Sequence, residues 1–310
     1  MTKRAAIFPG QGAQLVGMGR DVAAAYPAAA ETFAAADDIL GFRLSSLCFA
    51  GPPERLDATD IQQPAIFTTS VALFRAGVAA GRFAPDSFAA LGGLSLGEYT
   101  ALHLAGAVSF EDALRLVHRR GELMQQAAEQ HAGAMVSILG LDEEQVLALC
   151  KRVAGHGRVR PANYNCPGQI VISGDKPACD AAAALADEFG CRAVPLKVAG
   201  AFHSELMRSA ADGLRPALEA CVFQTPRVPV IANVDAGYHG APAAIRDSLY
   251  RQVVSPVRWQ ACVERLIADG CTEFWEIGPN RHLAGMMRKI NRGMKTLNVG
   301  TAGDLSPAPN

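Results

Sequence analysis

Twice within the first 105 residues, a short apolar run ends in a glycine-rich turn and is followed by a helix-forming stretch. The runs cover residues 5–8 and 87–92, and helices are predicted over residues 20–40, 96–105 and 110–130. Short strands that are apolar throughout and separated by helices are typical of a parallel sheet covered on both faces. The sequence therefore predicts an α/β fold.

The middle of the chain predicts a different unit. Its pattern gives strands over residues 134–139, 159–164, 169–173 and 192–198, with helices over 142–153 and 177–189. This βαββαβ order is the ferredoxin-like pattern. We expect residues 128–198 to form this small domain, inserted into a large domain made of residues 1–127 and 199–310.

The C-terminal part continues the pattern of the large domain. Helices are expected over residues 204–220 and most of 249–268, with strands over 228–233 and 273–277. The tail, residues 301–310, is rich in glycine, proline and polar residues, and we expect it to be loosely packed.

Composition excludes several classes of function. Net charge is −1 and charged residues make up 19%, so no broad field favours nucleic acid or anionic lipid as a partner. No apolar run approaches the length of a membrane helix. The eight cysteines are scattered without any Cys-x-x-Cys pair, which favours a reducing compartment. We expect a cytoplasmic protein, with no nucleic acid or membrane among its partners.

A G-x-S-x-G motif lies between a predicted strand and a predicted helix, centred on Ser95 and flanked by Gly93 and Gly97. A serine on such a sharp turn exposes its hydroxyl, and glycines on either side let neighbouring chain pass closely. The helix N-terminus offers N–H groups to a developing oxyanion. The motif alone also fits a glycine-rich turn with a capping serine, but its position between strand and helix favours a nucleophile.

A serine nucleophile needs a base, and seven histidines are candidates. His103 and His118 lie inside predicted helices, where packing or surface roles are usual, and His282 lies near a helix start. His203 lies in a turn of small residues just before a helix, whose N-terminus keeps an imidazole neutral. The residues alone leave the choice open.

Metal and nucleotide sites have little support. No H-E-x-x-H motif and no paired cysteines occur, so we expect no metal. Gly10 and Gly12 resemble the start of a dinucleotide fingerprint, but Leu15 stands where the third glycine belongs. We expect no cofactor.

Taken together, the motifs resemble the malonyl-CoA:acyl carrier protein transacylase family, over residues 7–299. They occur in the family's order: Phe8-Pro9-Gly10-Gln11-Gly12, Gly93-Leu94-Ser95-Leu96-Gly97-Glu98-Tyr99, Arg120-Gly121 with Met124-Gln125, Asn163-Tyr164-Asn165 with Pro167-Gly168-Gln169, Gly200-Ala201-Phe202-His203-Ser204, and Glu276-Ile277-Gly278-Pro279. The resemblance implies an α/β hydrolase-like large domain with a ferredoxin-like insert. It also implies malonyl-CoA and acyl carrier protein as substrates, in fatty acid biosynthesis. We expect a monomer.

The resemblance also assigns the chemistry. Ser95 would attack the malonyl thioester, and His203 would take its proton. The backbone N–H groups of Gln11 and Leu96 would hold the oxyanion. A backbone carbonyl, rather than an aspartate, would orient the histidine.

Four further residues would bind substrate or support the site. The resemblance implies that Arg120 would bind the free malonyl carboxylate. Its neighbour Arg119 points about 100° away around a helix, so both cannot serve. Gln252 and Asn163 match family positions at the site, and Phe202 would leave little room for a methyl branch.

Two departures from the family pattern concern the surroundings of the site. Leu94 stands where histidine often precedes the nucleophile, and Asn280-Arg281 replaces an expected Gly-Lys. Three alternatives remain: an esterase or thioesterase, an inactive docking subunit, and a loader for a polyketide synthase or malonate decarboxylase. The basic residues Arg288, Lys289, Arg292 and Lys295 fit either a solvated helix end or a docking site for the acidic carrier.

Overall fold

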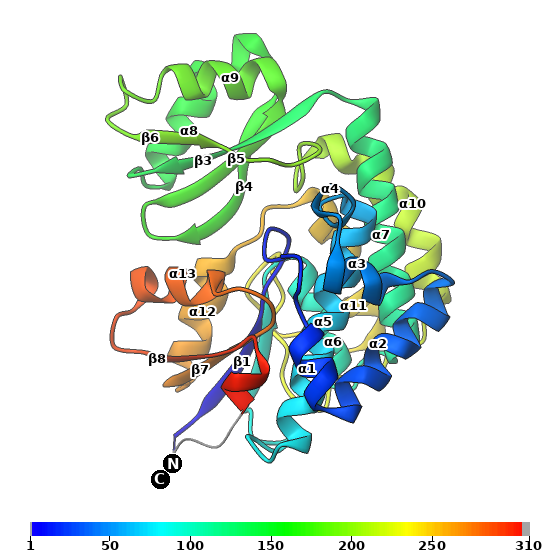
Figure 1. Cartoon of the computed structure of the whole chain (residues 1–310). Helices are drawn as coiled ribbons and strands as arrows, with labels where there is room; N and C mark the ends of the chain where they lie inside the picture. Colours follow the sequence, from blue (N-terminus) through cyan, green and yellow to red (C-terminus); the bar gives the residue numbers. More distant parts are fainter. Residues whose placement is uncertain (1, 306–310) are drawn as a thin grey trace.

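The computed structural model describes residues 2–305, and its larger part is built on a parallel sheet (Figure 1). Its strands follow the order β2-β1-β7-β8, and their bounds are β1 Arg4–Phe8, β2 Ala90–Gly93, β7 Glu273–Ile277 and β8 Lys295–Val299. Ala6 and Phe8 of β1 pack on one face of this sheet, whereas Ala5 and Ile7 pack on the other. The sheet is therefore buried on both faces, as the predicted α/β fold requires.

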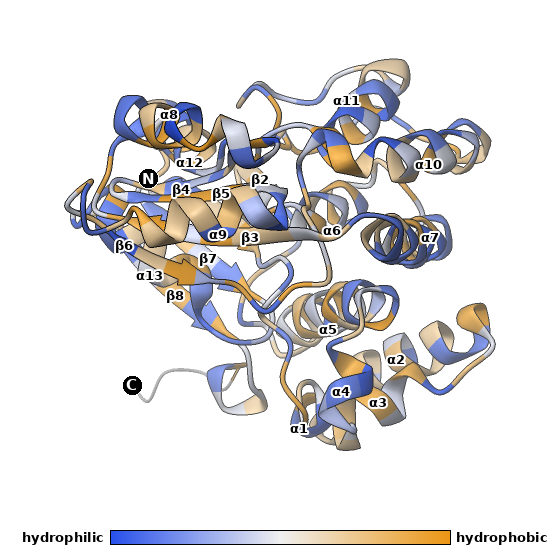
Figure 2. Ribbon diagram, turned by 90° about the horizontal axis from the view of Figure 1, so that it is seen from above, coloured by the Kyte–Doolittle hydropathy of each residue, from blue (hydrophilic) through white to orange (hydrophobic). Residues whose placement is uncertain are grey.

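Helices cover both faces of this sheet. The helices of the large part are α1 Arg20–Ala25, α2 Pro27–Leu40, α3 Leu44–Ala50, α4 Pro53–Leu56, α5 Thr59–Ala79, α6 Leu96–Leu104, α7 Phe110–Gln130, α10 Arg208–Ala220, α11 Pro242–Val254, α12 Trp259–Ala268 and α13 His282–Ile290. Ala5 and Ile7 share a core with α12 and α13, and the opposite face shares one with α2, α5 and α7. In Figure 2 the hydrophilic side of α7 lies toward the outside.

The small part is an antiparallel sheet with order β4-β5-β3-β6. Its elements are β3 Gly133–Leu139, α8 Glu143–Arg152, η1 Ala154–His156, β4 Val159–Cys166, β5 Gln169–Asp175, α9 Lys176–Ala184 and β6 Arg192–Pro195. α8 and α9 share a separate hydrophobic core with this sheet. The predicted βαββαβ order is confirmed, while the domain boundary at residues 128–198 remains a proposal.

Several predicted elements differ from the structure. The helix over residues 20–40 breaks at Tyr26 because Pro27 starts a new helix, and the helix over 249–268 is interrupted between Val254 and Trp259. The helix over 177–189 ends at Ala184. Residues 204–220 begin with a 3₁₀ turn, η2 Glu205–Met207.

Two further predictions fail near the edges of the fold. Residues 228–233 form isolated bridges from Val230 and Ile231 rather than a strand. The tail is not loose throughout, because η3 Ala302–Leu305 ends with a fully buried Leu305; residues 306–310 lie outside the described part. Within residues 2–305, the structure contains no helix long and apolar enough to cross a membrane.

Candidate active site

Ser95 lies on the turn between β2 and α6, in a backbone conformation with φ 51° and ψ −100°. Chain segments pass very close to this turn. A Cβ on Gly97 would lie 2.2 Å from the Phe8 carbonyl oxygen, and a Cβ on Gly93 would lie 2.0 Å from the Gly97 carbonyl carbon. Both glycines of the G-x-S-x-G motif are therefore required by close approach of the backbone.

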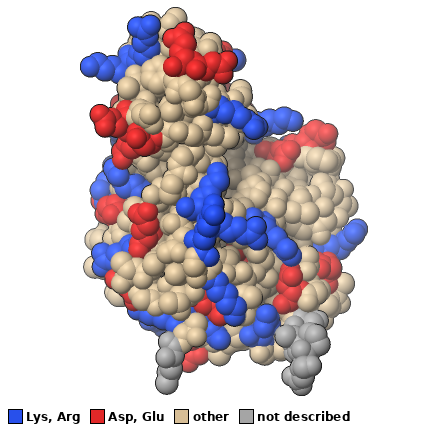
Figure 3. All heavy atoms as spheres, turned by 90° about the vertical axis from the view of Figure 1, so that its left-hand side faces the viewer, with Lys and Arg blue, Asp and Glu red and all other residues tan. Residues whose placement is uncertain are grey.

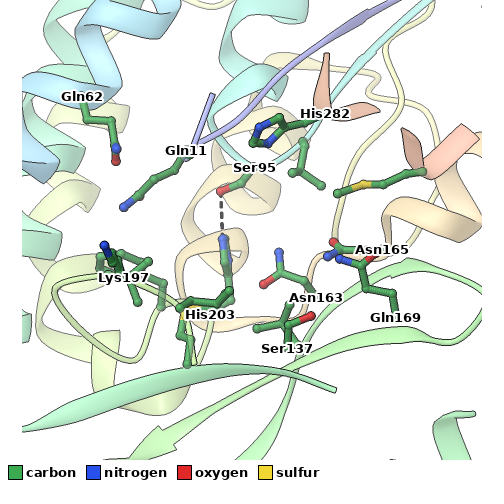
Figure 4. A pocket seen from close by; sticks show the side chains of 18 of the residues that line it. Gln11, Gln62, Ser95, Ser137, Asn163, Asn165, Gln169, Lys197, His203 and His282 are labelled. Carbon is green, nitrogen blue, oxygen red and sulfur yellow. Dashed lines mark hydrogen bonds between the residues drawn. The ribbon is translucent and has the colours of Figure 1, made fainter. Parts of the chain in front are cut away.

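The hydroxyl of Ser95 faces His203. Ser95 Oγ lies 2.8 Å from His203 Nε2 (Figure 4), and His203 Nδ1 lies 2.9 Å from the backbone carbonyl oxygen of Gln252. A carbonyl only accepts hydrogen bonds, so Nδ1 carries the hydrogen and Nε2 of the neutral ring presents its lone pair to Ser95. The imidazole is thus oriented to accept the serine proton, with a backbone carbonyl behind it.

The surroundings keep this ring neutral. Burial and, to a smaller extent, the nearby Arg120 charge lower the pKa of His203 to about 4. At pH 7 the ring is therefore a free base. His282 also lines the cavity around Ser95, but within residues 2–305 no hydrogen bond joins it to the hydroxyl.

Arg120 projects from α7 toward the same hydroxyl and is only 2% exposed. Nη2 donates to Ser95 Oγ at 2.9 Å and to Gln252 Oε1 at 3.1 Å, and Nη1 donates to Gln63 Oε1 at 2.6 Å. Burial lowers the pKa of Arg120. In the described part of the chain no carboxylate forms an ion pair with this guanidinium, so the site holds a buried cation whose hydrogen bonds all go to neutral oxygens.

The neighbouring arginine has a different environment. Arg119 is exposed and its Nη1 pairs with Glu122 Oε2 at 2.9 Å. Only one of the two adjacent arginines reaches the site, as the helical geometry predicts.

A cavity of about 310 Å³ opens onto Ser95 between the large part and the small sheet (Figure 4). Gln11, Phe202, Asn163 and His203 line it together with Ser95. Met135 and Ser137 of β3 contribute to the opposite wall. Both parts of the chain therefore form the pocket.

The structure brings the sequence-predicted residues together. Leu96 is the first residue of α6, where a helix has no internal acceptor for its N–H. Within residues 2–305, neither the Leu96 N–H nor the Gln11 N–H donates to a protein acceptor. Leu94, the departure before the nucleophile, lines the cavity.

Several polar residues at the site were not predicted from the sequence. Gln63 lies on α5, a helix that was also not predicted. Asn233 and His239 follow α10 in a segment without regular strands. Among these polar residues, only Glu98 has a signal in the sequence, because it directly follows the G-x-S-x-G motif. In the described residues no group of three metal-binding side chains comes together.

Comparisons with known proteins agree with this geometry. The acyl transferase domain family matches residues 6–305. The malonyl CoA-acyl carrier protein transacylase of Bacillus subtilis is 46% identical over 301 residues, 96% of this chain and 94% of that protein. The crystal structure of the acyl-carrier-protein S-malonyltransferase from Bartonella henselae superposes with a TM-score of 0.94 at 40% identity, covering 98% and 97% of the two chains.

A third relative was solved as a complex. It is a malonyl-transacylase in complex with a type II PKS acyl-carrier protein, with a TM-score of 0.93, 41% identity and 98% coverage of both chains. The fold, the matched length and these identities lead to one assignment. The chain belongs to the malonyl CoA-acyl carrier protein transacylase family.

Proposed function

We propose that this protein moves the malonyl group from malonyl-CoA to the phosphopantetheine thiol of acyl carrier protein, through an ester on Ser95. Ser95 Oγ attacks the thioester carbonyl while His203 Nε2 takes its proton, and the thiol of CoA leaves with that proton. The carrier thiol then gives its proton to His203 and displaces the ester, which restores the Ser95 hydroxyl.

The observation that carries the substrate assignment is the buried guanidinium of Arg120, which forms no ion pair within residues 2–305. Its contacts are a hydroxyl and two amide oxygens, all neutral. A buried charge is costly unless an opposite charge pairs with it. The free carboxylate of a malonyl group supplies that charge beside the nucleophile, and a planar guanidinium holds a carboxylate through two parallel hydrogen bonds.

The remaining predicted residues receive supporting roles. The N–H groups of Gln11 and Leu96 hold the oxyanion of the tetrahedral intermediate. Gln252 orients His203 through its carbonyl and Arg120 through its side-chain oxygen. Asn163 offers a polar side chain to the substrate, and Phe202, 3% exposed, fills the space that a methyl branch of methylmalonyl-CoA requires.

Fatty acid biosynthesis is the proposed setting, and a cytoplasmic monomer the proposed form. All eight cysteines are unpaired and seven are buried, as is usual in a reducing compartment. The similarity to a malonyl-transacylase that was solved with a type II PKS carrier makes a polyketide synthase carrier the second candidate. Comparison of transfer rates to carriers of both kinds separates the two.

Mass spectrometry after brief mixing with malonyl-CoA tests the proposal directly. We expect an adduct of one malonyl group on Ser95, absent in Ser95→Ala, that is discharged by carrier protein with ping-pong kinetics. Release of free malonate as fast as transfer would instead indicate a hydrolase. Failure to form any acyl-enzyme would indicate an inactive docking subunit.

A further inference from the structure

Glu98 is a fully buried carboxylate one helical turn after the nucleophile, and it does not line the cavity. Its oxygens have three nitrogen partners. Oε2 accepts from the Asn233 backbone N–H at 3.0 Å and from Gln252 Nε2 at 2.7 Å, and Oε1 lies 2.7 Å from His239 Nε2. A buried carboxylate is costly unless hydrogen bonds replace its hydration, and these three contacts do so on both oxygens.

The contacts of Glu98 form a network with two arms, one through Asn233 and one through Gln252. The first arm, through Asn233, holds the serine turn. The Asn233 side chain accepts from the Ser95 backbone N–H at 2.6 Å and donates to the Gly93 carbonyl at 2.8 Å. It thereby bridges the two sides of a turn whose central residue has a positive φ. Glu98 fixes the backbone from which this side chain extends.

The second arm runs through Gln252. Its Nε2 donates to both Glu98 Oε2 and the Ser95 carbonyl, at 2.7 and 3.0 Å. With Nε2 held in this way, Oε1 must face the opposite side, where Arg120 donates to it. The backbone carbonyl of the same residue accepts from His203 Nδ1.

Both arms meet at the Glu98 carboxylate, with His239 behind it. His239 and Glu98 side chains are 1% and 0% exposed, so neither group reaches substrate. We propose that Glu98 is a positioning residue: through Asn233 and Gln252 it sets the strained Ser95 turn, the direction of His203 and the direction of Arg120. The inference rests on the proposed acyl transfer at Ser95.

Glu98 acts through the positions of its oxygens rather than through its charge. The acylation rates of Glu98 variants should therefore follow how well each side chain keeps those positions. Glu98→Gln retains an oxygen for both donors and presents its amide to His239, which can accept in its other tautomer. Glu98→Asp shortens the side chain and cannot reach both arms. Glu98→Ala removes them. A misplacement of about 1 Å can cost about 10²-fold in rate, so we expect acylation rates in the order Gln, Asp, Ala, with Ala about 10²-fold below wild type.

Single-turnover acylation by malonyl-CoA, followed by mass spectrometry of the Ser95 adduct, measures the effect. In Glu98→Ala the maximal rate should fall because the serine turn and His203 lose their positions, and the half-saturating malonyl-CoA concentration should rise because Gln252 no longer directs Arg120. The proton resonance of His203 Nδ1–H, assigned by its absence in His203→Ala, should shift in Glu98→Ala. A merely structural role would leave the resonance and the rate of the folded protein unchanged.

Glu273 offers a matched control. It is also a buried carboxylate, 5% exposed, and it binds Arg4, Lys295 and the Trp275 indole outside the catalytic site. Glu273→Gln should lower thermal stability but leave the acylation rate and the His203 resonance unchanged. If Glu98→Ala does not fold, Asn233→Ala, which removes only the first arm, should still lower the maximal rate through the serine turn.

The outcomes separate this proposal from the function on which it rests. Acylation in Glu98→Ala or Asn233→Ala at the wild-type maximal rate, with the His203 resonance in place, would overturn the positioning role. A wild-type protein that forms no malonyl adduct would instead contradict the proposed acyl transfer.

Discussion

Arg120 Nη2 donates a hydrogen bond to Ser95 Oγ over 2.9 Å. The same oxygen lies 2.8 Å from the neutral Nε2 of His203, so the hydroxyl is placed between a cation and a base. The cation stabilises negative charge on Oγ as its proton leaves, but it also disfavours the imidazolium. A carboxylate bound to Arg120 cancels this second effect, so substrate binding makes His203 a stronger base.

The free enzyme should therefore react with a neutral serine reagent, such as phenylmethylsulfonyl fluoride, down to unusually low pH. His203 must be unprotonated to act, so the inactivation rate should stay level above its pKa of about 4 and fall below it. In Arg120→Ala the inactivation rate should begin to fall at a higher pH, because the Arg120 charge, which together with burial lowers the pKa of His203, is gone. If the inactivation rate of the wild-type protein instead falls near the ordinary histidine pKa of about 6.5, burial does not lower the pKa of this ring.

The free energy of unfolding should also depend on pH, because burial lowers the pKa of histidines in the folded protein. Burial lowers the pKa of both His203 and His103 to about 4, whereas unfolded histidines titrate near 6.5. Between these values the unfolded state binds more protons, so the free energy of unfolding should rise with pH from about 4 to 6.5. Urea denaturation at pH 5 and pH 7 measures the difference. The difference in the free energy of unfolding between the two pH values should be smaller in His203→Gln. If it is as large as in the wild type, other groups are responsible.

The features that the sequence predicted well are those with a local signal. α7 occupies residues 110–130 as predicted, because one side of it is polar and the other apolar. α5 was not identified, since 17 of its 21 residues are buried and no polar stripe marks it. Arg120 was placed by its motif, but its partner Gln63 lies on that unidentified helix.

Contacts between segments that are distant in the chain could not be predicted from the local sequence pattern. Asn233 contacts the serine turn 138 residues away along the chain, from a segment that we expected to be a strand. The choice of His203 among seven histidines depended on the resemblance, because only the folded chain brings it to Ser95, 108 residues earlier.

The glycine after the nucleophile should be irreplaceable. In Gly97→Ala the new Cβ would lie 2.2 Å from the Phe8 carbonyl oxygen, so the serine turn must shift. Such overpacking typically costs about 1–3 kcal/mol, and we expect the acylation rate to fall at least about tenfold. Gly155→Ala is the control, because beyond the adjacent residues of the chain no atom lies within 4 Å of the position that its new methyl group would take. Equal acylation rates in the two variants would show that the turn tolerates the displacement.

Basic residues at the end of α13 should help to bind the carrier. Arg288, Lys289, Arg292 and Lys295 are all exposed, and Lys295 also pairs with Glu273 at 2.8 Å. Figure 3 shows basic side chains gathered across the middle of one face of the molecule, and α13 also contributes Met286 to the cavity wall. An acidic carrier approaching the cavity would meet these charges.

Reversing two of these charges, in Arg288→Glu with Lys289→Glu, should raise the apparent KM for carrier protein at least about fivefold at low salt. Acylation by malonyl-CoA should not change. The matched control is the same reversal at Lys151 and Arg152, an exposed basic pair at the end of α8. Equal effects on both substrates, or none on the carrier, would argue for a solvated helix end.

Arg120 should decide which acyl group is transferred. Its guanidinium is buried beside the nucleophile with neutral partners only, so the malonyl carboxylate gains a desolvated, charge-assisted pair that acetyl cannot form. Losing one partner of such a pair costs about 2–5 kcal/mol, and each 1.36 kcal/mol is tenfold in rate. Malonyl transfer should therefore fall at least tenfold in Arg120→Ala.

Acetyl transfer should change far less in that variant, because loss of the cation removes both its stabilisation of charge on Ser95 Oγ and its opposition to the His203 imidazolium and to an apolar acyl group. Leu94 lines the cavity and offers no polar contact to the carboxylate, so no side chain at that position compensates for the loss. Arg120→Lys should recover only part of the malonyl rate, since an ammonium cannot form the two parallel bonds. Arg119→Ala is the matched control, because Arg119 is exposed and pairs with Glu122. The measurement is the ratio of malonyl to acetyl transfer. A ratio that is the same in wild type, Arg119→Ala and Arg120→Ala would remove the physical basis for malonyl selection.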